Sequence, residues 1–345
     1  MPSTTSTMTI TPGPVPDLSQ YDIICGNVSG GADSRAMQHV LMGAARAAGV
    51  ADRVWTFHAS LGPMEWPSVT FGGRRYGSVA ELAAQQSRES GVPAARHMER
   101  TKTRDDGAGG REPYDLLTYT ALYGRFMRLN TRYCTKSFKE QLEESSHTPE
   151  VQRLGLLLGR PVRVLKVLGL RGEESPQRAR RLAYRCVKSN GARHVDEWLP
   201  TKDWTKEEVR GLHADEGYAW HWCYDSEPGA GDWLGSSRCS CSSCFLASRR
   251  DSLLGVLRRP RIAEAIALAE EVRGDSFRAD VSMAELIAAS KRPGAPVPGV
   301  VIEDEGPDYA RMMEQLTTAL QQEPRRLPEL ALSAGPRPLL PLVVT

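Results

Sequence analysis

A glycine-rich turn between an apolar segment and a helical segment constrains this chain more than any other feature. The apolar segment is Ile23-Ile24-Cys25, the turn is Ser29-Gly30-Gly31-Ala32-Asp33-Ser34, and a helical pattern continues from Arg35 to Ala48. The two glycines can adopt backbone angles closed to other residues and let the main chain approach a ligand. Hydroxyls and amides of the turn, with the unpaired N–H groups that begin a helix, favour an anion. The turn therefore predicts a phosphate site.

Asp33 has two interpretations within this turn. Its carboxylate can bind a magnesium ion, or it can cap the helix. A plain strand-to-helix turn without a ligand is the alternative for the whole segment. The pattern matches neither G-x-x-x-x-G-K-[ST] nor G-x-G-x-x-G, so the sequence carries neither the usual triphosphate loop nor the dinucleotide fingerprint.

The order of apolar and amphipathic segments predicts alternating strands and helices, which is typical of a parallel sheet. We expect strands over residues 21–28, 53–58 and 161–170, and helices over 33–48, 78–90, 115–130, 205–216 and most of 261–290. The segment 101–112 is expected to be a polar loop. Because open parallel sheets bind ligands at the carboxyl ends of their strands, the turn after the first strand and residues 59–62 after the second should share one edge.

Charge is balanced over the whole chain but not locally. There are 44 basic and 42 acidic side chains, which give a net charge of +2 and exclude wholesale electrostatic binding of nucleic acid. The segment 160–193 carries ten Lys or Arg residues against two acids. Such a cluster can bind a nucleic-acid backbone or a polyphosphate, or it can be a solvated basic face.

The sequence favours a cytoplasmic protein with no membrane partner. Residues 1–20 are rich in Ser, Thr and Pro and lack the apolar core of a secretory signal. No later segment approaches the roughly 20 apolar residues of a membrane helix. In the cytoplasm thiols stay reduced, so clustered cysteines indicate metal or redox chemistry.

Three of the seven cysteines lie in Cys239-Ser240-Cys241-Ser242-Ser243-Cys244. This spacing lets sulfurs converge on one metal centre, with Cys134 or Cys223 as the candidate fourth ligand. Sulfur ligation suits an iron–sulfur cluster or zinc, and spacing does not choose between them. A redox pair Cys241–Cys244 and inert thiols remain alternatives. His58 ends the second expected strand, where it is either a nucleotide contact or a structural histidine.

Six ordered motifs between about residues 21 and 255 resemble those of the phosphoadenosine phosphosulfate (PAPS) reductase family, within the PP-loop ATP pyrophosphatases or adenine nucleotide α-hydrolases. The motifs are residues 29–34, 61–67, 132–135 with Lys139, 169–178, 198–200 with 203–205, and Arg238 with Cys241, Cys244 and Asp251. The resemblance implies a Rossmann-like α/β fold with a parallel sheet flanked by helices. The nucleotide-binding domain would span 21–215, followed by a mostly helical, cysteine-bearing region over 216–322. A disordered segment, 1–20, and a Pro-rich tail, 323–345, would flank them.

The resemblance also implies residue roles. The nucleotide would be bound by Ser29, Gly30, Gly31, Ala32, Ser34, His58, Glu174 and Ser175. Asp33, Arg171, Arg178 and Cys134 would be catalytic. The metal ligands would come from Cys134, Cys239, Cys241, Cys244 and Cys223.

The implied activity is the splitting of ATP between its α and β phosphates, with Mg²⁺, adenylyl transfer and sulfur transfer. The motifs are most similar to those of DNA phosphorothioation-type sulfurtransferases, which hold a four-iron (4Fe-4S) cluster and need a sulfur donor protein or reductant. One alternative is a sulfonucleotide reductase that produces sulfite. The intact glycine turn and the lack of a cysteine after Cys244 count against it. The other alternative is a nucleotide-binding module without turnover, whose metal, such as zinc, is structural.

Overall fold

The computed structural model describes residues 14–239 and 241–326. Its centre is a six-stranded sheet in the order β5-β2-β1-β8-β10-β9, in which only the edge strand β9 runs antiparallel to its neighbour. The strands are β1 Ile23–Asn27, β2 Val54–Ser60, β5 His97–Thr101, β8 Val162–Leu168, β9 Tyr184–Ser189 and β10 Arg193–Trp198. The prediction of an α/β fold with a parallel sheet is therefore confirmed, except at the antiparallel edge strand β9.

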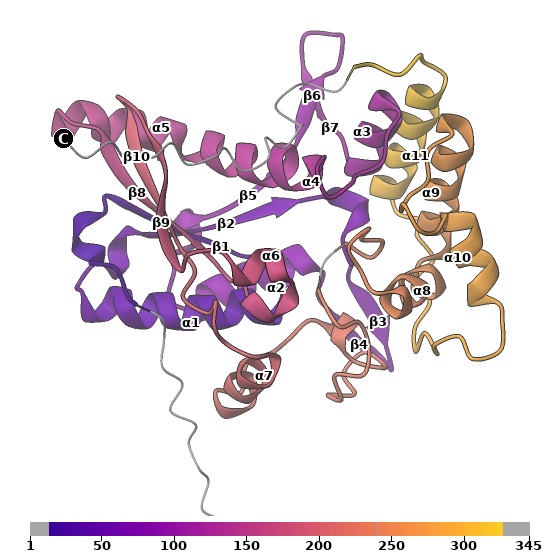
Figure 1. The fold of residues 1–345 in the computed structure, drawn as a ribbon, viewed down its shortest axis with the longest axis horizontal. Helices are drawn as coiled ribbons and strands as arrows, with labels where there is room; N and C mark the ends of the chain where they lie inside the picture. Colours follow the sequence, from indigo (N-terminus) through magenta and orange to yellow (C-terminus); the bar gives the residue numbers. More distant parts are fainter. Residues whose placement is uncertain (1–13, 240, 327–345) are drawn as a thin grey trace, which may run out of the picture.

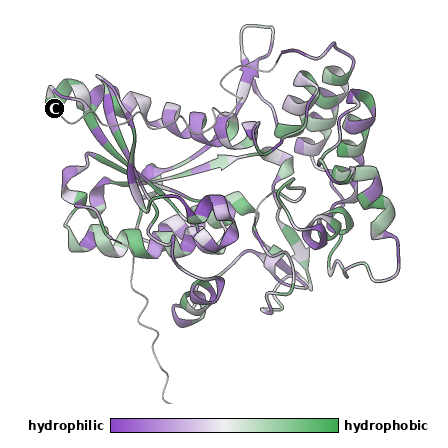
Figure 2. Ribbon diagram, in the orientation of Figure 1, coloured by the Kyte–Doolittle hydropathy of each residue, from purple (hydrophilic) through white to green (hydrophobic). Residues whose placement is uncertain are grey.

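Helices cover both faces of this sheet (Figure 1). One face carries α1 Ala32–Ala47 and α2 Val79–Glu89, and the opposite face carries α5 Gln141–Leu158. The main core lies between the sheet and the first of these layers, where Ile24, Leu41 and Leu165 are fully buried. Figure 2 shows hydrophobic residues along the central strands and on the helices beside them. None of the described helices is both long and apolar enough to cross a membrane.

A second, helical unit packs beside the sheet around its own buried cluster. Its helices are α3 Leu116–Tyr123, α8 Arg249–Arg258, α9 Pro260–Arg273, α10 Met283–Ser290 and α11 Pro307–Leu320. The expected helical character of 261–290 is confirmed by α9 and α10. However, α3 comes from within the segment expected to form the nucleotide-binding domain, so this unit is built from two distant parts of the chain.

The remaining elements are short or connect the two units. They are α4 Tyr133–Thr135, a π-helical turn Lys136–Glu140, α6 Pro176–Ala179, α7 Lys206–Asp215, the hairpin β3 Val69–Phe71 with β4 Arg74–Tyr76, the hairpin β6 Thr103–Asp105 with β7 Arg111–Pro113, and single 3₁₀ turns at Leu18–Gln20, Ala51–Arg53, Gly62–Met64, Ala94–Arg96, Gly172–Glu174 and Trp222–Tyr224. A capping box of Thr205 and Glu208 begins α7, as the sequence predicts.

Three expectations are corrected. The segment 101–112 is largely the β6–β7 hairpin, in which Thr103 pairs with Pro113 and Asp105 with Arg111, and not a plain loop. The helix expected over 115–130 ends at Tyr123, because Gly124 takes a left-handed φ of 70° that terminates it. Ordered structure begins before residue 21, since Leu18 is buried in the main core. Residues 1–13 and 327–345 of the two expected terminal segments lie outside the described residues.

Candidate functional site

The glycine turn has a preformed shape after β1. Gly30 has a φ of 65°, and a Cβ placed on it would lie 2.6 Å from the Val79 carbonyl oxygen, so only glycine fits. Gly31 is the N-cap of α1, which corrects the reading of Asp33 as the cap. Ser34 Oγ donates to the Gly31 carbonyl oxygen (2.8 Å) and accepts from Ser29 N–H (3.3 Å). These bonds close the turn around the first N–H groups of α1.

Two residues far along the chain brace this turn. Tyr224 Oη accepts a hydrogen bond from the Ala32 N–H (3.1 Å), and His213 Nε2 lies 3.1 Å from the Ala32 carbonyl oxygen. Burial lowers the pKa of His213, so the ring is neutral and its Nε2–H donates. No local sequence signal links either residue to the turn, so neither contact is predictable from the sequence.

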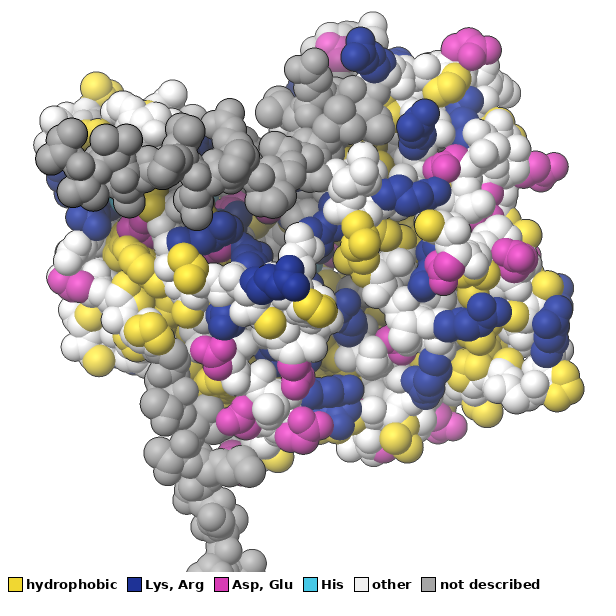
Figure 3. Space-filling view, viewed as in Figure 1, with side chains coloured by type: hydrophobic (Ala, Val, Ile, Leu, Met, Phe, Trp, Pro, Cys, Tyr) yellow, Lys and Arg dark blue, Asp and Glu magenta, His cyan; other side chains and the backbone are white. Residues whose placement is uncertain are grey.

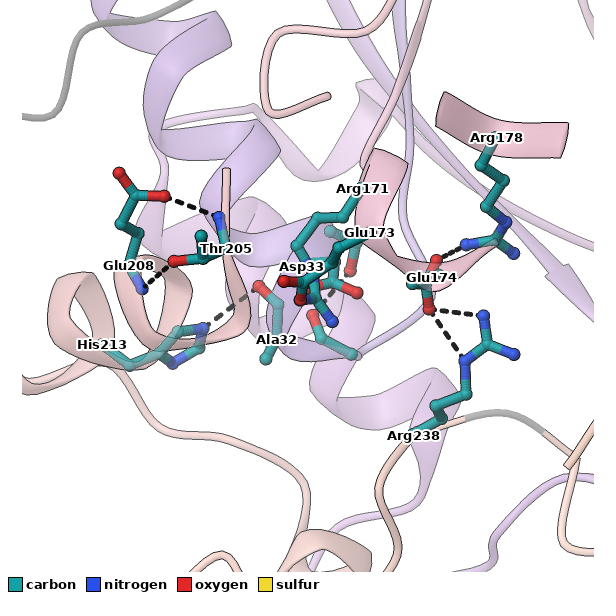
Figure 4. Close-up of polar contacts among 12 residues, drawn as sticks. Ala32, Asp33, Arg171, Glu173, Glu174, Arg178, Thr205, Glu208, His213 and Arg238 are labelled. Atoms are coloured by element: carbon teal, nitrogen blue, oxygen red, sulfur yellow. Dashed lines mark hydrogen bonds and ion pairs between the residues drawn. The ribbon is translucent and has the colours of Figure 1, made fainter. Parts of the chain in front are cut away.

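Arginines and acids from the 169–178 motif lie next to the turn (Figure 4). Arg171 Nε donates to Asp33 Oδ1 (2.7 Å), and the same guanidinium pairs with Glu173. Glu174 pairs with Arg178 and accepts from Arg238 Nε (2.8 Å). Burial, followed by repulsion from Arg238, lowers the pKa of Arg178 to about 10. The positive charges are therefore crowded, and a bound anion would relieve their repulsion.

A cavity of about 320 Å³ brings the turn, the cations and four thiols together. Its lining includes Ser29, Gly31, Ala32, Asp33, Ser34, Arg132, Cys134, Lys139, Arg171, Glu174, Arg178, Arg238, Cys239, Cys241 and Cys244. Figure 3 shows Lys and Arg side chains around the hollowed centre of the molecule. An adjoining cavity of about 570 Å³ shares Ser29 and Arg178 and extends past Ala59 and Leu168, at the carboxyl ends of β2 and β8.

The cysteine segment is held against the loop that follows β2. Ser242 N–H donates to the Met64 carbonyl oxygen (3.0 Å), and Glu65 forms a β-bridge with Cys241. Arg259 donates to the Pro63 carbonyl oxygen (2.6 Å) and to Ser242 Oγ (3.2 Å). Through these contacts, a segment some 200 residues after the glycine turn forms part of the lining of the same cavity.

Cys134, Cys241 and Cys244 lie close enough to influence one another's ionisation. Burial raises the pKa of both the Cys134 and the Cys241 thiol. The neighbouring Cys244 raises the pKa of Cys241 further. Lys139 lies beside them in the π-helical turn, a feature that often marks functional sites. Burial opposes its charge, but Cys241, Cys134 and Glu65 outweigh that effect and raise the pKa of Lys139. Lys139 thus stays a cation beside Cys134 and Cys241.

Cys239 and Cys223 form a different group, together with His221. Their sulfurs and a ring nitrogen of His221 all lie within 4.8 Å of one another, whereas the described residues Cys134, Cys241 and Cys244 form no such compact group. A hydrogen bond from Cys223, with His221 nearby, lowers the pKa of Cys239, and burial raises the pKa of Cys223. All seven cysteines are described, and none forms a disulfide.

The other predicted site residues have structural contacts. His58 is buried, with Nδ1 3.0 Å from the Val28 carbonyl oxygen and Nε2 3.4 Å from Glu65 Oε2, and it borders only the second cavity. Burial opposes protonation of His58, but Glu65 outweighs it and raises its pKa. Ser175 Oγ caps α6 by accepting from Arg178 N–H (3.2 Å). Gly30, Ser175 and Cys223 lie outside the linings of both cavities.

Acidic partners, most of them outside the segment, largely neutralise the basic segment 160–193. Its ion pairs are Arg160 with Asp22, Lys166 with Glu143, Arg171 with Asp33, Arg178 with Glu174, Arg181 and Arg185 with Glu197, and Lys188 with Glu144. Most of its residues lie in β8, β9 and the α6 region, so it is not one helix face. This pairing leaves less free positive charge than the sequence suggests.

No protein-family model matches the chain, and no curated protein matches it. The fold and the cavity therefore define it only as a mostly parallel α/β protein with a glycine turn, cations and thiols at one edge of its sheet.

Proposed function

We propose that this protein is a PP-loop ATP pyrophosphatase of the sulfurtransferase type. It would bind ATP, split it between the α and β phosphates by adenylyl transfer, and couple this step to sulfur transfer. One observation carries the proposal: a single cavity contains both the glycine turn and the thiols Cys134, Cys241 and Cys244. Because these parts are separated by 100 to 215 residues, local folding alone does not explain their meeting.

The chain's own groups suit the binding of a polyphosphate. The outer phosphates would lie on the turn, where backbone N–H groups and the start of α1 favour an anion. Arg171, Arg178 and Arg238 can stabilise the charge that develops as the α–β bond breaks. Asp33 already holds Arg171 at the mouth of the turn, and it would bind Mg²⁺ by exchanging this cation for the metal. The adenosine would occupy the adjoining cavity at the ends of β2 and β8.

The three thiols fit the sulfur ligation of an iron–sulfur cluster, with zinc as the alternative occupant. Cluster ligands bind different iron atoms and stand farther apart than the ligands of a single ion, so the described thiols Cys134, Cys241 and Cys244 need not form one compact group. Since the pKa of two of these thiols is raised, cluster binding would release protons. When bound, the cluster would supply the sulfur chemistry beside the nucleotide.

The proposed partners are an adenine nucleotide and a sulfur donor protein or reductant. The acceptor that becomes adenylated is the third partner. The ion pairs within 160–193 give no specific support to a nucleic-acid acceptor at that segment.

Pyrophosphate release from ATP by the anaerobically purified protein tests this proposal. Asp33→Asn keeps a hydrogen-bond acceptor for Arg171 but removes the charge, and it should lower the release rate by roughly 100-fold, the scale for losing a transition-state contact. Asp52→Asn changes an exposed aspartate on the surface and should leave the rate unchanged.

Three results would contradict the proposal. An Asp33→Asn variant as active as the wild type would remove the assigned role. Sulfite formed from PAPS and a thiol, without pyrophosphate from ATP, would instead identify a sulfonucleotide reductase. Nucleotide binding without any product would indicate a binding module.

A further inference from the structure

Cys223 and Cys239 are not joined by a disulfide, and they differ in their exposure to solvent. Cys223 is fully buried beneath the glycine turn, whereas Cys239 is partly exposed and lines the first cavity. Their sulfurs lie within 4.8 Å of each other although the residues are sixteen positions apart. A small molecule in the cavity can therefore reach the Cys239 sulfur, and the buried Cys223 sulfur lies next to it.

His221 completes this pair from the same 3₁₀ turn as Cys223. Its Nδ1 accepts the Cys223 N–H (3.2 Å), which places the ring proton of the neutral form on Nε2. That Nε2 is buried and has no hydrogen-bond partner among the described residues, while the side chain as a whole is 1% exposed. Because Nδ1 accepts a backbone N–H and Nε2 carries the proton, neither nitrogen of the neutral ring is free to ligate a metal.

We propose that Cys239 and Cys223 are a reversible dithiol–disulfide couple that reacts with small disulfides through the cavity. The Cys239 thiolate attacks a low-molecular-weight disulfide such as oxidised glutathione, which forms a mixed disulfide and releases one thiolate. The Cys223 sulfur, after losing its proton, then attacks Cys239 Sγ, and the second glutathione thiolate leaves. The two cysteines are oxidised by two electrons, and one glutathione disulfide is reduced to two thiols.

The position of the pair links this reaction to the glycine turn. A Cβ placed on Gly31 would lie 3.5 Å from Cys239 Cβ, and Tyr224, the residue after Cys223, accepts the Ala32 N–H. A disulfide requires the sulfurs to approach to about 2.05 Å, so at least one of the two segments must move. Because Tyr224 Oη occupies the Ala32 N–H, one of the donors at the turn, movement of the Cys223 segment should change the affinity of the turn for an anion by about fivefold.

Peptide mapping of the full-length protein tests the couple without any variant. The anaerobically purified chain is equilibrated with defined ratios of reduced and oxidised glutathione, its remaining thiols are alkylated, and its disulfides are identified by mass spectrometry. We expect one intramolecular bond, Cys223–Cys239, which a dithiol reductant reverses. Exposed Cys186 provides the internal control, because it should stop at a mixed disulfide.

Variants separate the two chemical steps. Cys223→Ser should trap glutathione on Cys239, and Cys239→Ser should leave Cys223 unmodified because it is buried. The proposal is overturned if the bond joins Cys241 to Cys244 or to Cys239, if no intramolecular bond forms, or if bound zinc protects the pair.

ATP binding to the reduced and oxidised protein, measured by calorimetry, tests the link to the turn. The ATP affinity of the wild-type protein should change by about fivefold after oxidation, and the affinity of Cys239→Ser should not change. Equal affinities with the disulfide present would refute the link. The Cys223–Cys239 couple lies beside the proposed nucleotide site but does not depend on the proposed function. Failure of ATP to bind the reduced protein would count against the proposed function. The peptide map would still show whether the Cys223–Cys239 disulfide forms.

Discussion

At the scale of single residues, the surroundings that the fold provides shift the pKa of buried side chains of the same type in opposite directions. His147 is 4% exposed and packs edge-on against Trp55 behind the sheet. Burial, followed by the nearby Arg193 and Lys166, lowers its pKa to about 4. His58, equally buried, has a raised pKa because Glu65 faces it. The same residue type is therefore kept neutral at one place and charged more readily at another.

The lowered pKa of His147 predicts a pH dependence of stability. Between about pH 6.5 and 4 the unfolded chain binds a proton at this position and the folded chain does not, so stability falls as pH falls through this window. The wild type should lose up to about 3 kcal/mol of unfolding free energy there relative to His147→Gln. Urea unfolding of both proteins at pH 7 and pH 4 measures this difference. Parallel loss in both proteins would show that His147 contributes nothing.

At the scale of elements, the glycine turn depends on what packs against it. The left-handed φ of Gly30 and its approach to the Val79 carbonyl join the turn to the start of α2. A Cβ on Gly169 would likewise lie 2.5 Å from the Asp33 carbonyl oxygen, so the end of β8 touches the start of α1. Two glycines thus let three elements meet at the mouth of the cavity.

Gly30→Ala should destabilise the protein by roughly 1–3 kcal/mol, because alanine is strained at this φ and its Cβ meets a backbone oxygen. It should also weaken ATP binding, since the turn must shift. Gly43→Ala is the matched control: it lies inside α1 with open space for a Cβ and should stabilise the protein by about 0.5–1 kcal/mol. Thermal unfolding and ATP titration compare the two variants. A Gly30→Ala protein as stable as the wild type would contradict the packing argument.

At the scale of the whole molecule, two adjacent arginines tie the helical unit to the sheet domain. Arg258 is fully buried and donates to the Cys223 (2.9 Å) and Asp225 (2.7 Å) carbonyl oxygens. Arg259 forms a buried ion pair with Asp304 and also reaches the loop after β2 and the cysteine segment. The cavity wall that carries the thiols therefore depends on the junction between α8 and α9.

Arg259→Met should destabilise the protein by about 3–5 kcal/mol, because it leaves Asp304 as a buried, unpaired carboxylate. Arg261→Met removes the exposed pair with Glu305 and should cost at most about 1 kcal/mol. Denaturant unfolding measures both. Adding Asp304→Leu to Arg259→Met should restore part of the loss, and a double variant no better than the single one would show that the ion pair is not the cause.

The sequence by itself determined the local features of this protein. Residues 29–34 specify a glycine turn because their backbone needs are local, and the same holds for the capping box of α7 and for the alternation of strands and helices. Three features were not predictable from the sequence: the antiparallel edge strand β9, the hairpin at 103–113 and the early end of α3. Tertiary packing and a left-handed glycine decide them.

Only the tertiary structure decided which distant residues meet. Spacing groups Cys239 with Cys241 and Cys244, yet the fold places Cys239 with Cys223 and His221, and it places Cys134 near the other two. Tyr224 and His213 reach the turn from 192 and 181 residues away. Arg160 and Arg171 of the basic segment likewise pair with acids 138 residues away. Such contacts depend on long-range packing, which decides where each side chain points. Local sequence patterns do not show which distant residues will meet.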